Sequence, residues 1–200
     1  MAAYSQGHHR RPGGPLTFAT LAGAWRPLLN FAVFQAAWFA CVAAAADGYV
    51  AWGMAAIGAA VLLHFALSDS LRTDALLTGI ALGLGLAWDT LAMQAGWIAY
   101  ASPGPVAGVA PAWILGLWAL FATTLRQPMR WLHGRPWLAA LLGAVSGPLS
   151  YAAAARMGAC SYEGPASLAA LGFGWALLMP LLLAVARRLE MRREPARALA

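Results

Sequence analysis

One carboxylate lies alone in a long apolar stretch of this sequence, and it is the residue most able to do chemistry there. Asp89 is the only charged residue between Ala75 and Tyr100. At a rise of 1.5 Å per residue, it would lie about 18 Å from the edge of a membrane-spanning helix, close to the midplane. An ionised aspartate at that depth costs about 2.5–3.5 kcal/mol on insertion scales. We therefore expect Asp89 to be hidden from lipid and to have polar neighbours.

The apolar segment 137–155 is predicted to supply those neighbours. Ser146 and Ser150 fall at depths that bracket the depth of Asp89. Between them, Pro148 removes a backbone donor and leaves one carbonyl without its usual partner. A proline at this place is compatible with a carrier site and also with an ordinary structural kink. The amide of Gln35 would also lie inside a span, where amides usually form hydrogen bonds between helices. The candidate intramembrane polar cluster is therefore Asp89, Ser146, Ser150, Tyr151 and Gln35.

Small side chains predict how the two segments meet. The helical face that carries Asp89 is narrow, and the segment 137–155 has a matching narrow stripe. Small residues on such faces let two helix backbones approach closely, so we expect these two helices to pack directly against each other. The small residues are Gly85, Ala92 and Gly96 on the first face and Ala139, Gly143 and Gly147 on the second.

Helices within a membrane must position these groups, because the composition excludes a soluble protein. Apolar residues make up 62% of the 200 residues and charged residues 10%, whereas globular chains have about 45–50% and 25%. The apolar runs have roughly 17–26 residues each, and about 20 residues of helix cross the hydrocarbon layer. The expected fold class is an all-α, polytopic bundle of six transmembrane helices, at residues 28–46, 49–67, 75–100, 109–125, 137–155 and 166–186.

The basic residues indicate how the bundle is oriented. All 13 are arginines, and with a cytoplasmic N-terminus only Arg156 falls on the far side of the membrane, as the positive-inside rule requires. The net charge of +6 is therefore an orientation signal, and no nucleic-acid partner is expected. Both termini are predicted to be cytoplasmic. The expected divisions are a cytoplasmic arm with an interfacial segment (1–27), the six-helix domain (28–186) and a basic tail (187–200).

Polar groups near the cytoplasmic ends form a second set of candidates. Asn30 and His64 would lie where water can reach them. In a loop rich in arginine, Arg126, Arg130 and His133 are spaced by four and three residues, which would align them on one face of a short helical turn. We expect that face to contact anionic lipid headgroups.

Motifs for cofactors and for covalent catalysis are not found in the sequence. It has no pair of histidines at metal-binding spacing and no CxxC pair, and it has no nucleophile elbow. No cofactor and no metal are expected. Cys41 and Cys160 would both lie toward the oxidising side of the membrane, so whether they are bridged stays open.

Three segments together resemble a bacterial inner-membrane family that is known only as a domain of unknown function. They read NFAVFQAAWF from Asn30, PAWILGLWALFATTL from Pro111 and GPLSY from Gly147, accompanied by His64 and the pair Trp88-Asp89. The resemblance covers residues 28–186. It implies a multi-pass membrane protein without an established activity. Fatty-acid-modification genes often neighbour members of the family, which implies a connection with envelope lipid.

Three functions remain open from the sequence. A non-enzymatic envelope or lipid-associated accessory protein is favoured by the arginine-rich loop and the resemblance. Its expected partner is membrane lipid, with a membrane protein or a second copy of the chain as further candidates. A small carrier or channel would use a midplane site around Asp89 and Pro148. An intramembrane lipid-modifying enzyme would use Asp89 with His64 or Tyr151, although the depths of Asp89 and His64 differ by roughly 13 Å.

Overall fold

Six α-helices and two very short strands make up the chain in a computed structural model, which describes the backbone of residues 18–198 and the side chains of residues 25–192. The helices are α1 (Phe18–Ala46), α2 (Val50–Ala66), α3 (Leu71–Gln94), α4 (Ala112–Ala122), α5 (Pro136–Arg156) and α6 (Pro165–Ala198), with a 3-10 turn η1 (Arg130–Leu132). Strands β1 (Ala99–Tyr100) and β2 (Cys160–Ser161) pair antiparallel. The expected all-helical fold class is confirmed.

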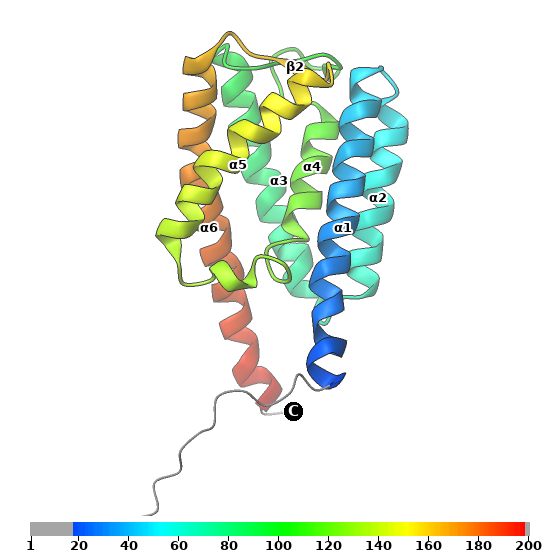
Figure 1. Ribbon diagram of the computed structural model, residues 1–200, viewed down its shortest axis with the longest axis vertical. Helices are drawn as coiled ribbons and strands as arrows, with labels where there is room; N and C mark the ends of the chain where they lie inside the picture. Colours follow the sequence, from blue (N-terminus) through cyan, green and yellow to red (C-terminus); the bar gives the residue numbers. More distant parts are fainter. Residues whose placement is uncertain (1–17, 199–200) are drawn as a thin grey trace, which may run out of the picture.

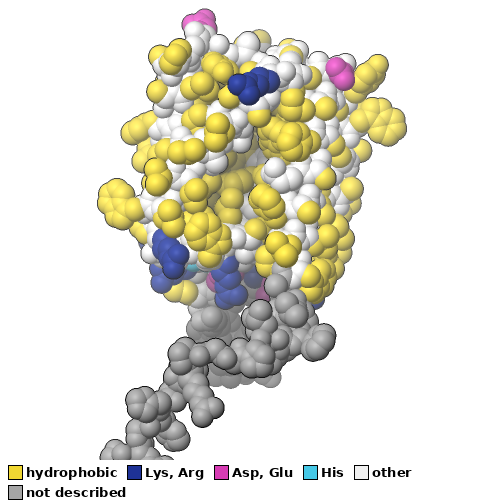
Figure 2. Space-filling view, viewed as in Figure 1, with side chains coloured by type: hydrophobic (Ala, Val, Ile, Leu, Met, Phe, Trp, Pro, Cys, Tyr) yellow, Lys and Arg dark blue, Asp and Glu magenta, His cyan; other side chains and the backbone are white. Residues whose placement is uncertain are grey.

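The helices run alternately up and down one bundle (Figure 1). α1 begins and α6 ends at the same end, named here the tail end, and β1 and β2 lie at the opposite end, named the strand end. On the face in Figure 2, hydrophobic side chains cover the flank and charged side chains gather toward the two ends. Among residues 25–192, large apolar side chains are exposed on every helix but α4, as at Phe39, Leu62, Leu86, Leu141 and Phe173. A lipid surrounding would cover them.

Four helical segments among the described residues are long and apolar enough to cross a membrane: Trp25–Ala46, Leu71–Gln94, Pro136–Arg156 and Pro165–Arg192. The helices α2, with 17 residues, and α4, with 11, are shorter. At 1.5 Å per residue, α4 extends only about 16 Å, roughly half of the hydrocarbon thickness. The span expected at residues 109–125 is therefore a much shorter helix than predicted.

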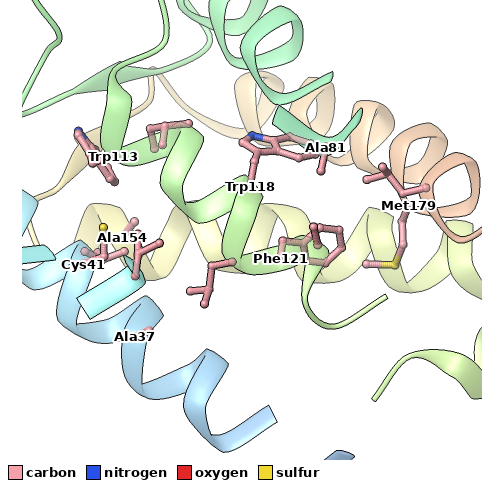
Figure 3. Packing of buried hydrophobic residues seen from close by; sticks show 14 of the residues in the cluster. Ala37, Cys41, Ala81, Trp113, Trp118, Phe121, Ala154 and Met179 are labelled. Carbon is pink, nitrogen blue, oxygen red and sulfur yellow. The ribbon is translucent and has the colours of Figure 1, made fainter. Parts of the chain in front are cut away.

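Local chemistry accounts for the short α4. Pro111 precedes the helix in an extended conformation, a place where its missing N–H costs nothing. At the other end, the hydroxyls of Thr123 and Thr124 donate to the carbonyls of Leu120 and Phe121, both at 2.7 Å, and the chain continues in tight turns. Side chains from α1, α3, α5 and α6 lie around α4 (Figure 3), and Met54 and Ile57 of α2 pack against Gly116 of α4. Irregular backbone at membrane depth needs protein cover of this kind.

Two predicted boundaries do not coincide with helix ends. The helix α1 runs from Phe18 through Pro27 without a break, so the predicted interfacial segment and the first predicted span share one helix. The helix α6 continues to Ala198, so the tail predicted from residue 187 begins inside a helix. Residues 1–17 and 199–200, which belong to the predicted arm and tail, lie outside the described residues.

The small-residue stripes do pack closely, but against different partners from those expected. A Cβ added to Gly85 on α3 would lie 2.2 Å from the ring of Trp118 on α4. A Cβ added to Gly143 on α5 would lie 2.2 Å from the carbonyl oxygen of Trp175 on α6. The expected direct packing of α3 on α5 is wrong, because the two stripes receive an indole ring from α4 and the backbone of α6.

Candidate functional site

Asp89 is almost completely buried, with a relative exposure of 1%, and its carboxylate accepts three hydrogen bonds. The hydroxyl of Tyr100 donates to Oδ1 at 2.5 Å, and the hydroxyl of Tyr151 donates to the same oxygen at 3.1 Å. The indole Nε1 of Trp118 donates to Oδ2 at 2.6 Å. Three donors on two oxygens are the complement of an ionised carboxylate, which only accepts hydrogen bonds. The strand β1 and the helices α4 and α5 thus jointly satisfy a group that α3 brings into the interior.

The Asp89 site lies toward the strand end of the bundle. Asp89 comes five residues before Gln94, where α3 ends, and Tyr151 comes five residues before Arg156, where α5 ends. Each is therefore about 7–8 Å from its helix end. The position differs from the expected midway one because α3 stops at Gln94 instead of continuing to residue 100. Gly96 follows with a φ of 73°, a conformation that favours glycine and ends a helix.

Aromatic rings hold the donors to the carboxylate in place. Trp118 stacks on Trp175 with ring centroids 5.0 Å apart and planes 9° apart. Phe121 meets Trp175 edge-on at 5.4 Å, and Tyr100 meets Trp113 edge-on at 5.3 Å. Stacked and edge-to-face contacts favour defined ring orientations. Packing by α4 and α6 therefore orients two of the three donors.

A cavity of about 350 Å³ adjoins the buried carboxylate. Its wall is mostly apolar and, among the described side chains, contains no Arg, Lys or His. Ser146 and Ser150 line the cavity and are nevertheless exposed, as is Phe31 on α1. The cavity therefore reaches the surface between α1 and α5, where the molecule is hollowed in Figure 2. Aromatic residues of α1, α4 and α6 form much of the wall: Phe34, Trp38, Trp113, Trp118, Phe121 and Trp175.

All members of the predicted intramembrane cluster meet at this cavity. Asp89, Ser146, Ser150, Tyr151 and Gln35 line it together. Of the expected neighbours, Tyr151 is the one that hydrogen-bonds to Asp89. The hydroxyl of Ser150 instead donates to the carbonyl of Ser146 at 2.9 Å. The fifth helix does supply a partner to Asp89, but it does so through the tyrosine and not through a serine.

Two of the groups that bind Asp89 were not sequence candidates. Tyr100 and Trp118 lie 11 and 29 residues further along the chain. Nothing local distinguishes Tyr100, and Trp118 is one of 10 tryptophans. The one signal for Trp118 was its place in the segment 111–125 that carries the family resemblance, and this signal does not say what the indole binds.

A second polar site, named here the Arg126 cluster, lies at the tail end. The guanidinium of Arg126 donates to Asp74 at 2.7 Å, to Asp69 at 2.8 Å and to Glu190 at 3.3 Å. Burial acts to lower the pKa of Arg126, but hydrogen bonds to Asp74 and Asp69 and their charges outweigh it, so the pKa is raised. The cluster ties the start of α3 and the chain after α4 to α6.

The predicted tail-end pair Asn30 and His64 joins the Arg126 cluster. The Nε2 of His64 lies 3.4 Å from the carboxylate of Asp74, and its Nδ1 lies 3.0 Å from the amide nitrogen of Asn30. The hydroxyl of Ser68 also donates to Asp74. The helices α1 and α2 are thus linked to the same carboxylate as Arg126.

The predicted headgroup face of the arginine-rich loop is divided in the structure. Arg126 has a relative exposure of 9% and turns inward to its three carboxylates, and His133 lies 3.4 Å from Glu190. Arg130 is exposed at the start of η1. The expectation of one shared exposed face is wrong for Arg126, because a buried guanidinium requires acceptors and the loop folds toward α3 and α6. Headgroup contact by Arg130 stays a prediction.

The family model described as protein of unknown function (DUF2878) matches residues 27–181. The chain belongs to this family. The matched residues include Asp89, its three hydrogen-bond donors and the whole described wall of the cavity, whereas Glu190 of the Arg126 cluster lies beyond the match. The resemblance found in the sequence is thereby confirmed. No curated protein and no solved structure matches the chain.

The two cysteines of this family member are buried and unbridged. Burial raises the pKa of the Cys160 thiol to about 11, and its Sγ lies 3.6 Å from the carbonyl of Tyr151. Within the part of the chain that the structure describes, no group of three or more His, Cys, Asp or Glu side chains could hold a metal ion. The side chains of the Asp89 site are a carboxylate, two phenols and several indoles.

Proposed function

We propose that this chain is an integral protein of a bacterial inner membrane that binds a lipid-like guest in the Asp89 cavity. The opening of the cavity is the observation that carries the proposal. About 350 Å³ of mostly apolar space reaches the surface between α1 and α5, on a flank where large apolar side chains are exposed. Pockets for small molecules typically enclose about 300–1,000 Å³ and have mostly apolar walls. An acyl chain can enter such a space sideways from the bilayer.

In this proposal all six helices cross the bilayer, with the tail end in the cytoplasm. The distribution of arginine supports this orientation. Arg156 lies at the strand end, whereas the other arginines with described side chains belong to tail-end segments: Arg26, Arg72, Arg126, Arg130, Arg135, Arg187, Arg188 and Arg192. The short α4 is compatible with six crossings because other helices surround it, so its own length need not match the hydrocarbon layer.

Binding is proposed in preference to catalysis because both oxygens of Asp89 already accept hydrogen bonds from the protein. The carboxylate therefore orders Tyr100, Tyr151 and Trp118 at one end of the cavity, and with a relative exposure of 1% it has little direct contact with a guest. A carrier would also need a route to water on both sides of the membrane. At the tail end, the Arg126 cluster joins four segments of the chain by ion pairs, which favours a closed end.

Filling the mouth of the cavity tests the proposal. Ser150→Trp places an indole at the opening. Leu149→Trp places the same side chain at the preceding position of α5, which is exposed and does not line the cavity. Lipid bound per protein is counted by native mass spectrometry after mild solubilisation. We expect Ser150→Trp to lose most of the tightly bound lipid and Leu149→Trp to retain it. Equal lipid in the two variants would contradict the proposal.

A further inference from the structure

We propose that the guest of the Asp89 cavity carries a cationic amine or a quaternary ammonium group, received by the aromatic rings in front of Asp89. The inference rests on the proposed function, since it assigns a chemical class to the guest of the same cavity. The guest would be an amphiphile with an apolar body and one positive charge.

The charge of the cavity is one-sided. Asp89 is the one carboxylate in the described wall, and no basic side chain accompanies it there. The ion pairs of the described side chains involve Asp69, Asp74 and Glu190, and none includes Asp89. Its three donors are uncharged, two phenols and an indole, so no cationic side chain of the described wall balances the carboxylate. In surroundings of low dielectric constant, an ionised carboxylate without a cationic partner attracts a cation more strongly than it would in water.

The rings of the wall supply a matching surface. Aromatic faces carry partial negative charge and attract a cation within about 6 Å of the ring centroid, and tryptophan does so most strongly. Cages of such rings recognise quaternary ammonium groups. Because Asp89 has a relative exposure of only 1%, its carboxylate acts on the guest from behind the rings. Three of the rings that line the cavity are partly exposed: Trp38 of α1, Tyr151 of α5 and Trp175 of α6. The rings of Trp113, Trp118 and Tyr100 also belong to the wall but are buried.

The position of the rings determines how the guest would lie. Tyr151 and Asp89 lie near the strand end, while Phe31 and Met129 line the same cavity nearer the tail end. The charged group would thus lie among the rings near the strand end, with the apolar body extending along α1 toward Phe31. An anionic group at the rings would face the carboxylate of Asp89 without a basic partner, and such like-charge contacts cost several kcal/mol.

Three probes of equal chain length test the class of guest: decyltrimethylammonium, decanol and decanoate. Decyltrimethylammonium and decanoate are titrated below their micelle concentrations, and decanol below its solubility limit, into the full-length protein in nanodiscs. Binding is measured by native mass spectrometry. We expect decyltrimethylammonium to bind about tenfold more tightly than decanol, and decanoate to bind most weakly. Asp89→Asn keeps the size of the side chain and should lower the ammonium affinity about tenfold while changing decanol binding less than about twofold.

The source of the ammonium group is tested by the lipid composition of the nanodiscs. Competition against decyltrimethylammonium by phosphatidylethanolamine, and not by phosphatidylglycerol, would assign the group to a membrane lipid. Absence of competition by both lipids would assign it to a freely diffusing amphiphilic amine. Either result is compatible with the ammonium inference.

The outcomes separate this inference from the proposed function. Equal affinities for decyltrimethylammonium and decanol would overturn the ammonium inference and leave lipid-like binding in place. Failure of all three probes, together with equal lipid in Ser150→Trp and Leu149→Trp, would overturn both. If Asp89→Asn does not fold, Trp38→Leu replaces it, since this variant removes a ring without touching the hydrogen bonds of Asp89. It should reduce the ammonium preference several-fold, and an unchanged preference would again overturn the inference.

Discussion

Gly85 offers a direct test of the packing that holds the Asp89 site. A methyl group at this position would lie 2.2, 2.3 and 2.5 Å from ring atoms of Trp118, well inside van der Waals contact. The ring has little room to retreat, because it is 4% exposed, stacks on Trp175 and donates to Asp89. Gly83, two residues earlier in α3, has nothing within 4 Å of the corresponding Cβ position. The two glycines therefore form a matched pair.

The magnitude follows from two opposing terms. Alanine is favoured over glycine inside a helix by about 1 kcal/mol, so Gly83→Ala should raise the free energy of unfolding by up to this amount. Overpacking a filled interior costs about 1–3 kcal/mol. Gly85→Ala should therefore leave the protein about 0–2 kcal/mol less stable than the wild type. The helix-propensity term is common to both variants, so their difference of about 1–3 kcal/mol isolates the contact with Trp118.

Unfolding in mixed micelles, followed by tryptophan fluorescence, measures the two free energies. The near-ultraviolet circular dichroism of the stacked indoles should change in Gly85→Ala and stay unchanged in Gly83→Ala, because only the first substitution presses on a ring. Equal stabilities and equal spectra for the two variants would refute the close approach of α3 and α4 on which the Asp89 site depends.

The other tests concern α5, the Arg126 cluster and the orientation of the bundle. Gly147→Leu should destabilise the protein more than Asp89→Leu, because a Cβ at Gly147 would lie 2.5 Å from an indole ring of α6. The free energies of unfolding of the two variants test this order, and the reverse order would contradict the close packing of α5 on α6. Arg126→Met should lower the free energy of unfolding by about 3 kcal/mol, since Asp74, itself 4% exposed, would lose its cationic partner. Arg72→Met, at an exposed arginine, is the control and should change the free energy of unfolding by less than about 0.5 kcal/mol. Equal effects of the two substitutions would contradict a stabilising buried ion pair between Arg126 and Asp74. Reporter fusions in the three strand-end connections, at Asp47, Pro105 and Glu163, should give periplasmic signals. Cytoplasmic signals at two of these sites would overturn the proposal of six crossings.

Composition and spacing were sufficient to predict the class of fold and the need to bury Asp89. Long apolar runs predict helices because lipid offers the backbone no hydrogen-bond partners outside its own helix. The same physics requires an intramembrane carboxylate to face protein, and Asp89 does so. The segment 137–155 was predicted to supply a partner, and Tyr151 of that segment donates to it. These conclusions depend only on local composition and on depth along a helix.

Only the tertiary structure decided which faces meet. Spacing along a helix determines which residues share a face, but the rotation of each helix and the path of each connection determine what that face contacts. The turn after Gly96 returns Tyr100 to Asp89, and the short α4 carries Trp118 to the same carboxylate. Spacing alone assigned Arg126 to the lipid surface. In the structure it turns inward to Glu190, 64 residues further along the chain, and to Asp74 and Asp69, 52 and 57 residues before it. The cavity likewise lies between α1 and α5, which are far apart in sequence, so no local pattern could have predicted it.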